Sequence, residues 1–149
     1  MLRLADNFAL ILVTAWVGGL WAIGYLAAPA LFYTLDDKQL AGLLAGRMFG
    51  WVAYLGLFSA FYLLIHRVMR SGTAALKQGF FWGVVAMLLL TLAGQYGIQP
   101  ILAQLKAQAG AVDVMQSVLA DRFRAWHGVA SIGYLLESLL GIAVVLKSR

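Results

Sequence analysis

Four long stretches of apolar residues, each nearly free of charged side chains, constrain this chain more than any other feature. They cover residues 8–35, 43–65, 79–98 and 127–146. A hydrocarbon core about 30 Å thick is crossed by about 20 residues of helix. Only 11% of the residues are charged, against roughly 25% in a soluble domain. We therefore predict an all-α, polytopic membrane domain in which the four stretches form a transmembrane helix bundle.

The one sizeable connection between these stretches, residues 99–126, has apolar residues at mostly helical spacing around Gly110. We expect an amphipathic helical segment on the outer side, which continues the third helix past Pro100 and then leads into the fourth. Capping of the bundle is its expected role, and binding of a partner or of the lipid surface is the alternative. In the first stretch, Pro29 lacks an N–H group, so it should disturb the helix near Tyr25.

The distribution of basic residues predicts the orientation of the chain. The loop 66–78 contains Arg67, Arg70 and Lys77 and no acidic residue, which is typical of a cytoplasmic loop. We therefore predict a bacterial inner-membrane protein with both termini in the cytoplasm. The net charge of +5 resides at helix ends, so it does not indicate a nucleic-acid partner. The absence of cysteine excludes disulfides and thiolate metal sites.

Glu137 is the one charged side chain in the fourth stretch, within the sequence GYLLESLLG. Gly133 and Gly141 stand four residues to either side, so all three share one helix face. Small residues at this spacing let membrane helices pack closely, so Glu137 should point into the bundle. A carboxylate at that depth costs about 2.5–3.5 kcal/mol and should be paired, protonated or hydrated. Close packing is also predicted for the overlapping GxxxG pattern of the second stretch, formed by Gly42, Gly46 and Gly50.

Several polar side chains are predicted to lie in or above the outer half of the membrane, on the outer side of Glu137. We predict that they line a vestibule that opens to the outside and narrows toward Glu137. They are Arg47, Gln95, His127, Ser131 and Tyr134. Hydrogen bonding between helices, worth about 0.6–2 kcal/mol per bond, is the alternative role for such groups.

No cofactor is predicted from the residues, and haem or copper is the alternative. His66 and His127 fall at opposite membrane faces, about 30 Å apart, so they cannot share one metal within a chain. His127 with Met48 is the weak candidate ligand pair for copper. The sequence contains no Ser-His-Asp constellation, P-loop or GxGxxG motif, which weighs against a soluble-type enzyme.

Three segments together resemble one known family: AWVGGLWAIGYLAAPALF at 15–32, AGLLAGRMFG at 41–50 and FRAWHGVASIGYLLESLLG at 123–141. The chain is similar along nearly its whole length to the bacterial domain of unknown function 4149, which is grouped with transmembrane protein 205-like proteins. This resemblance implies a small four-helix membrane protein, with drug and metal resistance suggested for eukaryotic relatives.

The segment WVGGL is also similar to the first helix of copper-resistance membrane proteins of the D type and, more faintly, to the membrane protoporphyrinogen oxidase family. Those families carry a histidine about two turns before the tryptophan. Here that region reads Asn7, Phe8, Ala9, so no haem or copper ligand is carried over.

Three functions remain open at this level. The first is transport of, or resistance to, a small solute or a cation or metal, through the vestibule that ends at Glu137. Because many transporters are built from paired repeats and this chain has none, transport would require a homo-oligomer. The second is a non-catalytic scaffold or accessory subunit of a larger membrane complex, and the third is a haem- or quinone-binding oxidoreductase. The expected partners are the lipid bilayer and either a second copy or another membrane protein.

Overall fold

The computed structural model describes residues 2–110 and 112–148, and these residues form helices joined by short turns, without strands. Four helical stretches are each long and apolar enough to cross a membrane: Arg3–Thr34, Lys38–Lys77, Gly79–Ala109 and Ala120–Leu146. The predicted all-α fold with four potential membrane spans is therefore confirmed. In lipid, a helix is favoured because it satisfies its backbone N–H and C=O groups within one segment.

The first two stretches form an antiparallel hairpin. The first consists of α1 (Leu2–Ala22), a π-helical turn η1 (Ile23–Ala27) and α2 (Ala28–Thr34). The second consists of α3 (Lys38–Ser71) followed by a 3-10 turn, η2 (Gly72–Lys77). Asp37 begins α3 by accepting hydrogen bonds from the backbone N–H groups of Gln39 and Leu40, at 2.9 and 3.0 Å. Gly72, at φ 55°, ends α3 in a backbone conformation that other residues rarely adopt.

The second hairpin comprises α4 (Gly79–Leu92), the π-helical turn η3 (Ala93–Ile98), α5 (Gln99–Ala109) and α6 (Ala120–Leu146). A short 3-10 turn, η4 (Val114–Gln116), lies between α5 and α6. The predicted connection 99–126 thus consists of α5, a compact turn and the first turns of α6. Ala111, within that connection, lies outside the described residues.

Both prolines of the chain lie just after a π-helical turn. Pro29 follows η1 and Pro100 follows η3. A proline has no N–H for the carbonyl four residues earlier, and its ring crowds that carbonyl. A wider turn relieves this crowding without ending the helix. The irregularity in the first stretch contains Tyr25, where Pro29 was expected to disturb the helix.

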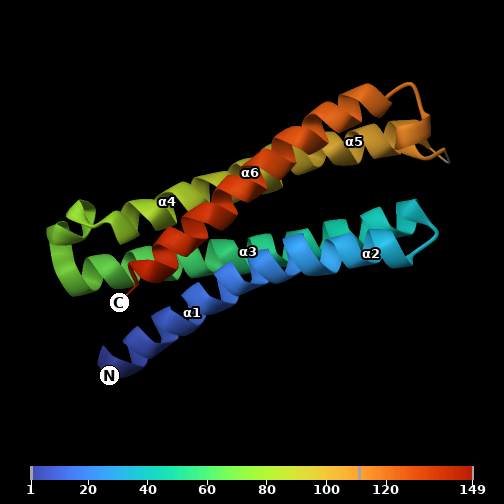
Figure 1. The fold of residues 1–149 in the computed structure, drawn as a ribbon. Coiled ribbons are helices and arrows are strands. Elements are labelled where there is room, and N and C mark those ends of the chain that lie inside the picture. The colour runs from blue at the N-terminus through green and yellow to red at the C-terminus, as the bar shows by residue number, and fades with distance from the viewer. Residues whose placement is uncertain (1, 111, 149) are drawn as a thin grey trace.

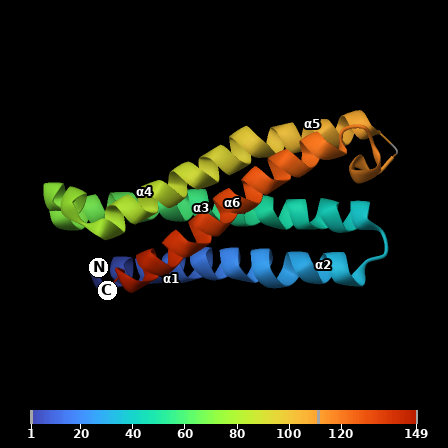
Figure 2. The same ribbon diagram turned by 45° about the horizontal axis from the view of Figure 1, so that its top comes forward.

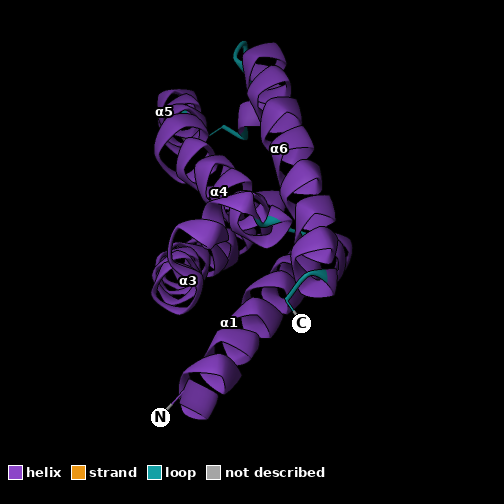
Figure 3. Ribbon diagram, turned by 90° about the vertical axis from the view of Figure 1, so that its left-hand side faces the viewer, coloured by secondary structure: helices purple, strands orange, loops and turns teal. Residues whose placement is uncertain are grey.

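The chain termini and the α3–α4 connection lie at one end of the bundle, the terminal end, and the other two connections lie at the distal end (Figure 1). Each long helical stretch packs against two others, in the order α1, α3, α4, α6 and back to α1. Toward the distal end α2 stays with α3 and α5 stays with α6, while the two hairpins diverge (Figure 2). Figure 3 shows the same splay from the terminal end.

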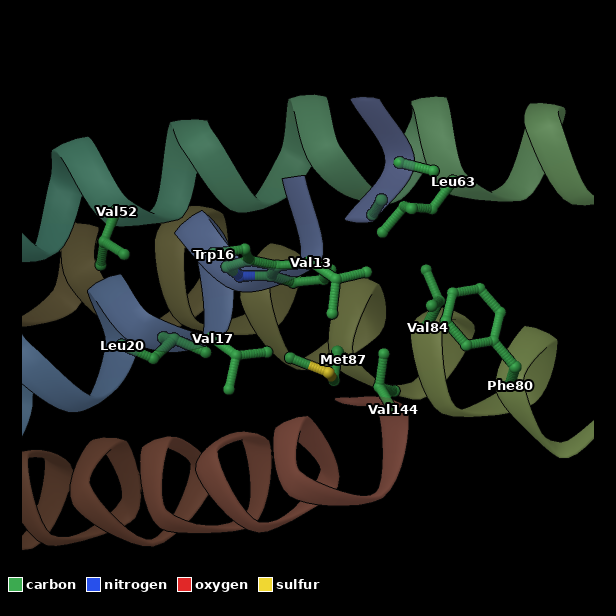
Figure 4. Packing of buried hydrophobic residues seen from close by; sticks show 12 residues of the cluster. Val13, Trp16, Val17, Leu20, Val52, Leu63, Phe80, Val84, Met87 and Val144 are labelled. Atoms are coloured by element: carbon green, nitrogen blue, oxygen red, sulfur yellow. The ribbon is translucent and has the colours of Figure 1, made fainter. Parts of the chain in front are cut away.

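The apolar core lies in the terminal half and the centre of the bundle, where all four long helices meet (Figure 4). Trp16 of α1 is its largest fully buried side chain, at 1% exposure. The same buried cluster contains Val13 and Leu20 of α1, Leu63 of α3, Val84 and Met87 of α4, and Val144 of α6. Many large apolar side chains on the outer surface are exposed, among them Trp51, Leu89 and Ile132, which suits contact with lipid tails.

Close helix contacts occur at a subset of the glycines. A Cβ at Gly56 would collide with the Trp16 indole, and one at Gly141 would stand 3.0 Å from Val17. Among the predicted packing glycines, Gly42 contacts the Phe32 side chain. A Cβ at Gly46, Gly50 or Gly133 would meet no described atom within 4 Å. These three glycines therefore do not bring helices of one chain together, and a role for them in contacts between chains stays a prediction.

We expect Gly56→Ala to destabilise the bundle by about 1–3 kcal/mol, because the added methyl must displace a fully buried indole. Gly18→Ala is the matched control, since its methyl would meet no atom within 4 Å and the substitution should be neutral or stabilise by up to about 1 kcal/mol. Unfolding of the detergent-solubilised protein measures both. Equal stability of the two variants would contradict the packing described here.

Candidate functional site

The interior of the bundle contains four buried polar side chains among the described residues: Ser59, Thr91, Glu137 and Ser138. Glu137 is 6% exposed, so its side chain points into the bundle, as predicted. It lies near the middle of α6, on the face that packs against α1 and α4. We call Glu137, Thr91, Trp16 and Tyr134 the Glu137 cluster.

Thr91 of α4 is the hydrogen-bond partner of Glu137. Its Oγ1 lies 2.7 Å from Glu137 Oε1 and 2.9 Å from the Met87 carbonyl oxygen. A hydroxyl has one hydrogen to donate and can also accept. When Glu137 is ionised, Thr91 donates to it. When Glu137 is protonated, it can donate to Thr91, whose own hydrogen then turns to Met87. The hydrogen bond between Thr91 and Glu137 can therefore form in either protonation state without moving a heavy atom.

Two other polar atoms near this level have no hydrogen-bond partner in the described chain. Trp16 Nε1 lies close enough to interact with the Glu137 carboxyl group, but it forms no hydrogen bond of normal geometry. Ser59 Oγ is also buried without a partner, one turn along α3 from the glycine on which Trp16 packs. A buried donor left unpaired costs about 1–3 kcal/mol. The interior thus retains unused hydrogen-bonding capacity beside its carboxyl group.

Tyr134 covers Glu137 on the distal side, one turn earlier in α6. Its hydroxyl donates to the Leu20 carbonyl at 2.6 Å. Its ring packs edge-on against Phe49, at 5.1 Å between centroids, and lies 6.3 Å from Tyr25. The ring occupies the space beside Gly24, where any side chain would collide with it. These contacts fix the Tyr134 ring against α1 and α3 on the distal side of Glu137.

The other predicted vestibule residues lie farther out, and none of them hydrogen-bonds to Glu137 in the described structure. The Arg47 side chain is exposed, and Gln95 and Met48 are half-buried. His127 is exposed, and its ring stacks on that of Phe123 with 5.8 Å between the ring centroids. The Ser131 hydroxyl donates to the His127 carbonyl oxygen at 2.9 Å. Among residues 2–110 and 112–148, no three His, Asp or Glu side chains are grouped closely enough to hold a metal ion. The proposed roles of these residues in a pathway stay predictions.

Sequence reasoning missed Thr91 and Trp16 as neighbours of the interior carboxyl group, and it did not predict the buried, unpartnered Ser59. One signal for Thr91 was available, because it is the only Ser or Thr within 79–98. No such signal existed for Trp16, since a tryptophan in an apolar helix is equally consistent with lipid contact.

Removing the Thr91 hydroxyl should destabilise the bundle, because Glu137 loses its donor. We expect Thr91→Val to lower the free energy of unfolding by about 1–3 kcal/mol. Thr14→Val is the matched control, since the exposed Thr14 hydroxyl donates at 2.9 Å to the Leu10 carbonyl of its own helix. Thermal unfolding in detergent compares the two. If both variants unfold like the wild type, the Thr91–Glu137 hydrogen bond does not contribute to stability.

Comparison with known proteins bears on the family of the chain. Residues 11–111 match the family model described as "Domain of unknown function (DUF4149)". The match begins at residue 11, within α1, and covers the rest of the first stretch and the second and third stretches, including α5; it ends before α6 and Glu137. No curated protein and no solved structure matches the chain significantly. Because the family model covers more than half of the 149 residues, the chain is a member of the DUF4149 family.

Proposed function

We propose that the protein transports, or confers resistance to, a small cation or solute, with Glu137 as the central binding carboxylate. The observation that carries this proposal is a carboxyl group that is 6% exposed and has Thr91 as its hydrogen-bond partner but no cationic partner among the described residues. Such a charge is costly in a membrane interior, so a proton or another cation must neutralise it. Intramembrane carboxylates commonly mark ion or proton pathways for this reason.

The hydrogen bonding around Glu137 supports reversible binding. Thr91 can serve as donor or acceptor, so the carboxyl group can gain or lose a proton with its partner in place. Trp16 Nε1 offers a second donor that would become useful when the carboxylate carries its full charge. The bundle therefore supplies both states of Glu137 with hydrogen-bond partners.

Access to Glu137 is the second part of the proposal. The conformation described here is closed on the distal side by Tyr134, and on the terminal side by the apolar core around Met87 and Val144. We infer that Tyr134 moves away from Gly24 and Phe49 to admit the solute from the distal end. Arg47, Gln95, His127 and Ser131 would line that approach. The distal end faces the outside of a bacterial inner membrane in this proposal, and both termini are cytoplasmic.

The test is flux through the protein reconstituted in liposomes, with entrapped indicators for H⁺, K⁺, Na⁺ and Zn²⁺. We expect the wild type to pass at least one of these ions and Glu137→Gln to fall to the level of empty liposomes, because the neutral amide cannot compensate a cation. Asp121→Asn is the matched control, since it removes the same charge from an exposed position of α6. Unchanged flux in Glu137→Gln would overturn the role assigned to the carboxylate.

A second candidate function, as a scaffold or accessory subunit, rests on two glycines of α3, the exposed Gly46 and the half-buried Gly50. Gly46 is exposed, and neither it nor Gly50 meets another atom within 4 Å of a Cβ position. Glycines spaced by four on a lipid-facing surface let another membrane helix approach closely. The occupant would be a second copy of this chain or another membrane protein.

Substitution at the GxxxG face tests whether this face is an interface between copies of the chain, which the scaffold and a homo-oligomeric transporter could both use. We expect Gly46→Leu to abolish association between copies, measured by native mass spectrometry, because the larger side chain keeps the helices apart. Gly18→Leu, at an exposed glycine of α1, is the matched control. Equal association of both variants with the wild type would show that the face is not an interface.

A further inference from the structure

A second polar cluster lies at the terminal end of the bundle, separate from Glu137, where α1, α3 and α4 meet the end of α6. A cavity of about 190 Å³ opens between these elements. This space is large enough for several water molecules or for a group of comparable size. Charged side chains of α1 and α3 line one part, and apolar side chains of α1, α3 and α4 line the other. A shallower hollow adjoins it, and the two share Arg67 and Phe80.

The charges around this cavity do not balance. Asp6 accepts a hydrogen bond from Arg70 and lies 3.1 Å from His66 Nε2, so its carboxylate already has a cationic partner. Arg67 and Lys147 have no carboxylate partner among the described residues. Arg70 lies close enough to Arg67 for their like charges to repel. The cluster therefore carries a surplus of positive charge that a bound anion would offset.

Arg67 is held in position with part of its hydrogen-bonding capacity unused. Its guanidinium lies over the Phe80 ring, 4.5 Å from the centroid, and Nη2 makes a long contact of 3.5 Å with the Lys147 carbonyl oxygen. Its Nε is buried without a hydrogen-bond partner in the described chain. A planar guanidinium fixed against an aromatic ring suits recognition of phosphate oxygens, to which it can donate two parallel bonds.

Lys147 approaches the same place from the end of α6. Its ammonium group lies over Gly79, where a side chain would begin, and Lys147 lines the hollow. Gln78 also lines this hollow, with a buried Oε1 that has no partner. Turning the amide by 180° would place its NH₂ donors there instead. Arg67, Lys147 and Gln78 thus form one face of the hollow.

We propose that this cluster binds a phosphate-bearing anion between Arg67 and Lys147. Two sources share that chemistry: the headgroup of an anionic phospholipid, and free phosphate or a soluble phosphate ester. Leu10, which is 53% exposed, and the apolar wall of the cavity would accommodate the start of an acyl chain. Basic pockets between membrane helices are a recurring way of binding lipid headgroups.

The experiment is a binding titration of the full-length, delipidated protein in detergent. In one arm, native mass spectrometry follows adducts with phosphatidylglycerol or with zwitterionic phosphatidylcholine. In the other arm, thermal unfolding is compared in inorganic phosphate and in chloride at equal ionic strength. The variants are Arg67→Gln and Lys147→Gln, and Lys77→Gln is the matched control, because Lys77 is exposed at the same end but lines neither hollow.

If the lipid is the source, one phosphatidylglycerol should bind in preference to phosphatidylcholine, and each test variant should bind it about tenfold more weakly or worse, as loss of a charged hydrogen bond implies. If free phosphate is the source, phosphate should raise the unfolding temperature of the wild type and of Lys77→Gln but not of the test variants. Lys147 lies at the end of α6 outside the core, so Lys147→Gln keeps the test decisive should Arg67→Gln not fold.

Two results would overturn the proposal. One is that both test variants bind phosphatidylglycerol and phosphate as strongly as the wild type does. The wild type binding neither ligand would overturn it in the same way. The other is an equal loss in Lys77→Gln, because the response would then reflect the total surface charge of this end and not the cluster.

Discussion

The packing of Trp16 against Gly56 is the contact on which the centre of this bundle depends. Between lipid-embedded helices there is little hydrophobic driving force, so stability comes from close van der Waals contact. The indole is almost fully buried, and it fits because α3 presents a hydrogen in place of a side chain where the ring lies. This contact joins α1 to α3 at the level where α4 and α6 contribute Thr91 and Glu137. The largest core residue is therefore also a neighbour of the interior carboxyl group.

The prolines affect the candidate site through the backbone. Pro29 is accommodated by the wide turn η1, and that turn contains Gly24, beside which the ring of Tyr134 lies. The Tyr134 hydroxyl bonds to the Leu20 carbonyl, one turn before Gly24. A regular helix with a larger residue at position 24 could not accept this ring. The position of the Tyr134 ring beside Glu137 thus depends on Gly24 and on Pro29, which lies five residues after Gly24 and disturbs the turn that contains it.

The sequence predicted those features that depend on lipid as the solvent. Hydropathy and length specify four helices, because a helix is the structure in which a single segment satisfies its own backbone N–H and C=O groups in hydrocarbon. The inward direction of Glu137 followed from its place between Gly133 and Gly141 on one helix face. Its hydrogen-bond partner could not be predicted in this way. The pairing of Thr91 with Glu137 depends on the axial position of α4 relative to α6, and no sequence pattern fixes that position for two apolar helices. The same limit applies to the glycines: GxxxG spacing marked Gly46 and Gly50, whereas Gly56 makes the close contact because it lies opposite Trp16.

The hydrogen bonding of the interior argues that the Glu137 cluster is not arranged for stability alone. A carboxyl group, an indole N–H and a serine hydroxyl are buried near one level of the bundle, and the last two lack partners in the described structure. Each unpaired group costs about 1–3 kcal/mol, and an apolar residue of similar size would avoid that cost. The interhelical hydrogen bond to Thr91 accounts for the carboxyl group, but not for the indole N–H and the serine hydroxyl, which form no hydrogen bond of normal geometry in the described structure. A bound solute that carries charge or hydrogen-bonding groups would pair with the indole N–H and the serine hydroxyl. Water admitted by a movement of Tyr134 would do the same. Under the proposed function, these unpaired groups would serve the solute or the water that enters the bundle.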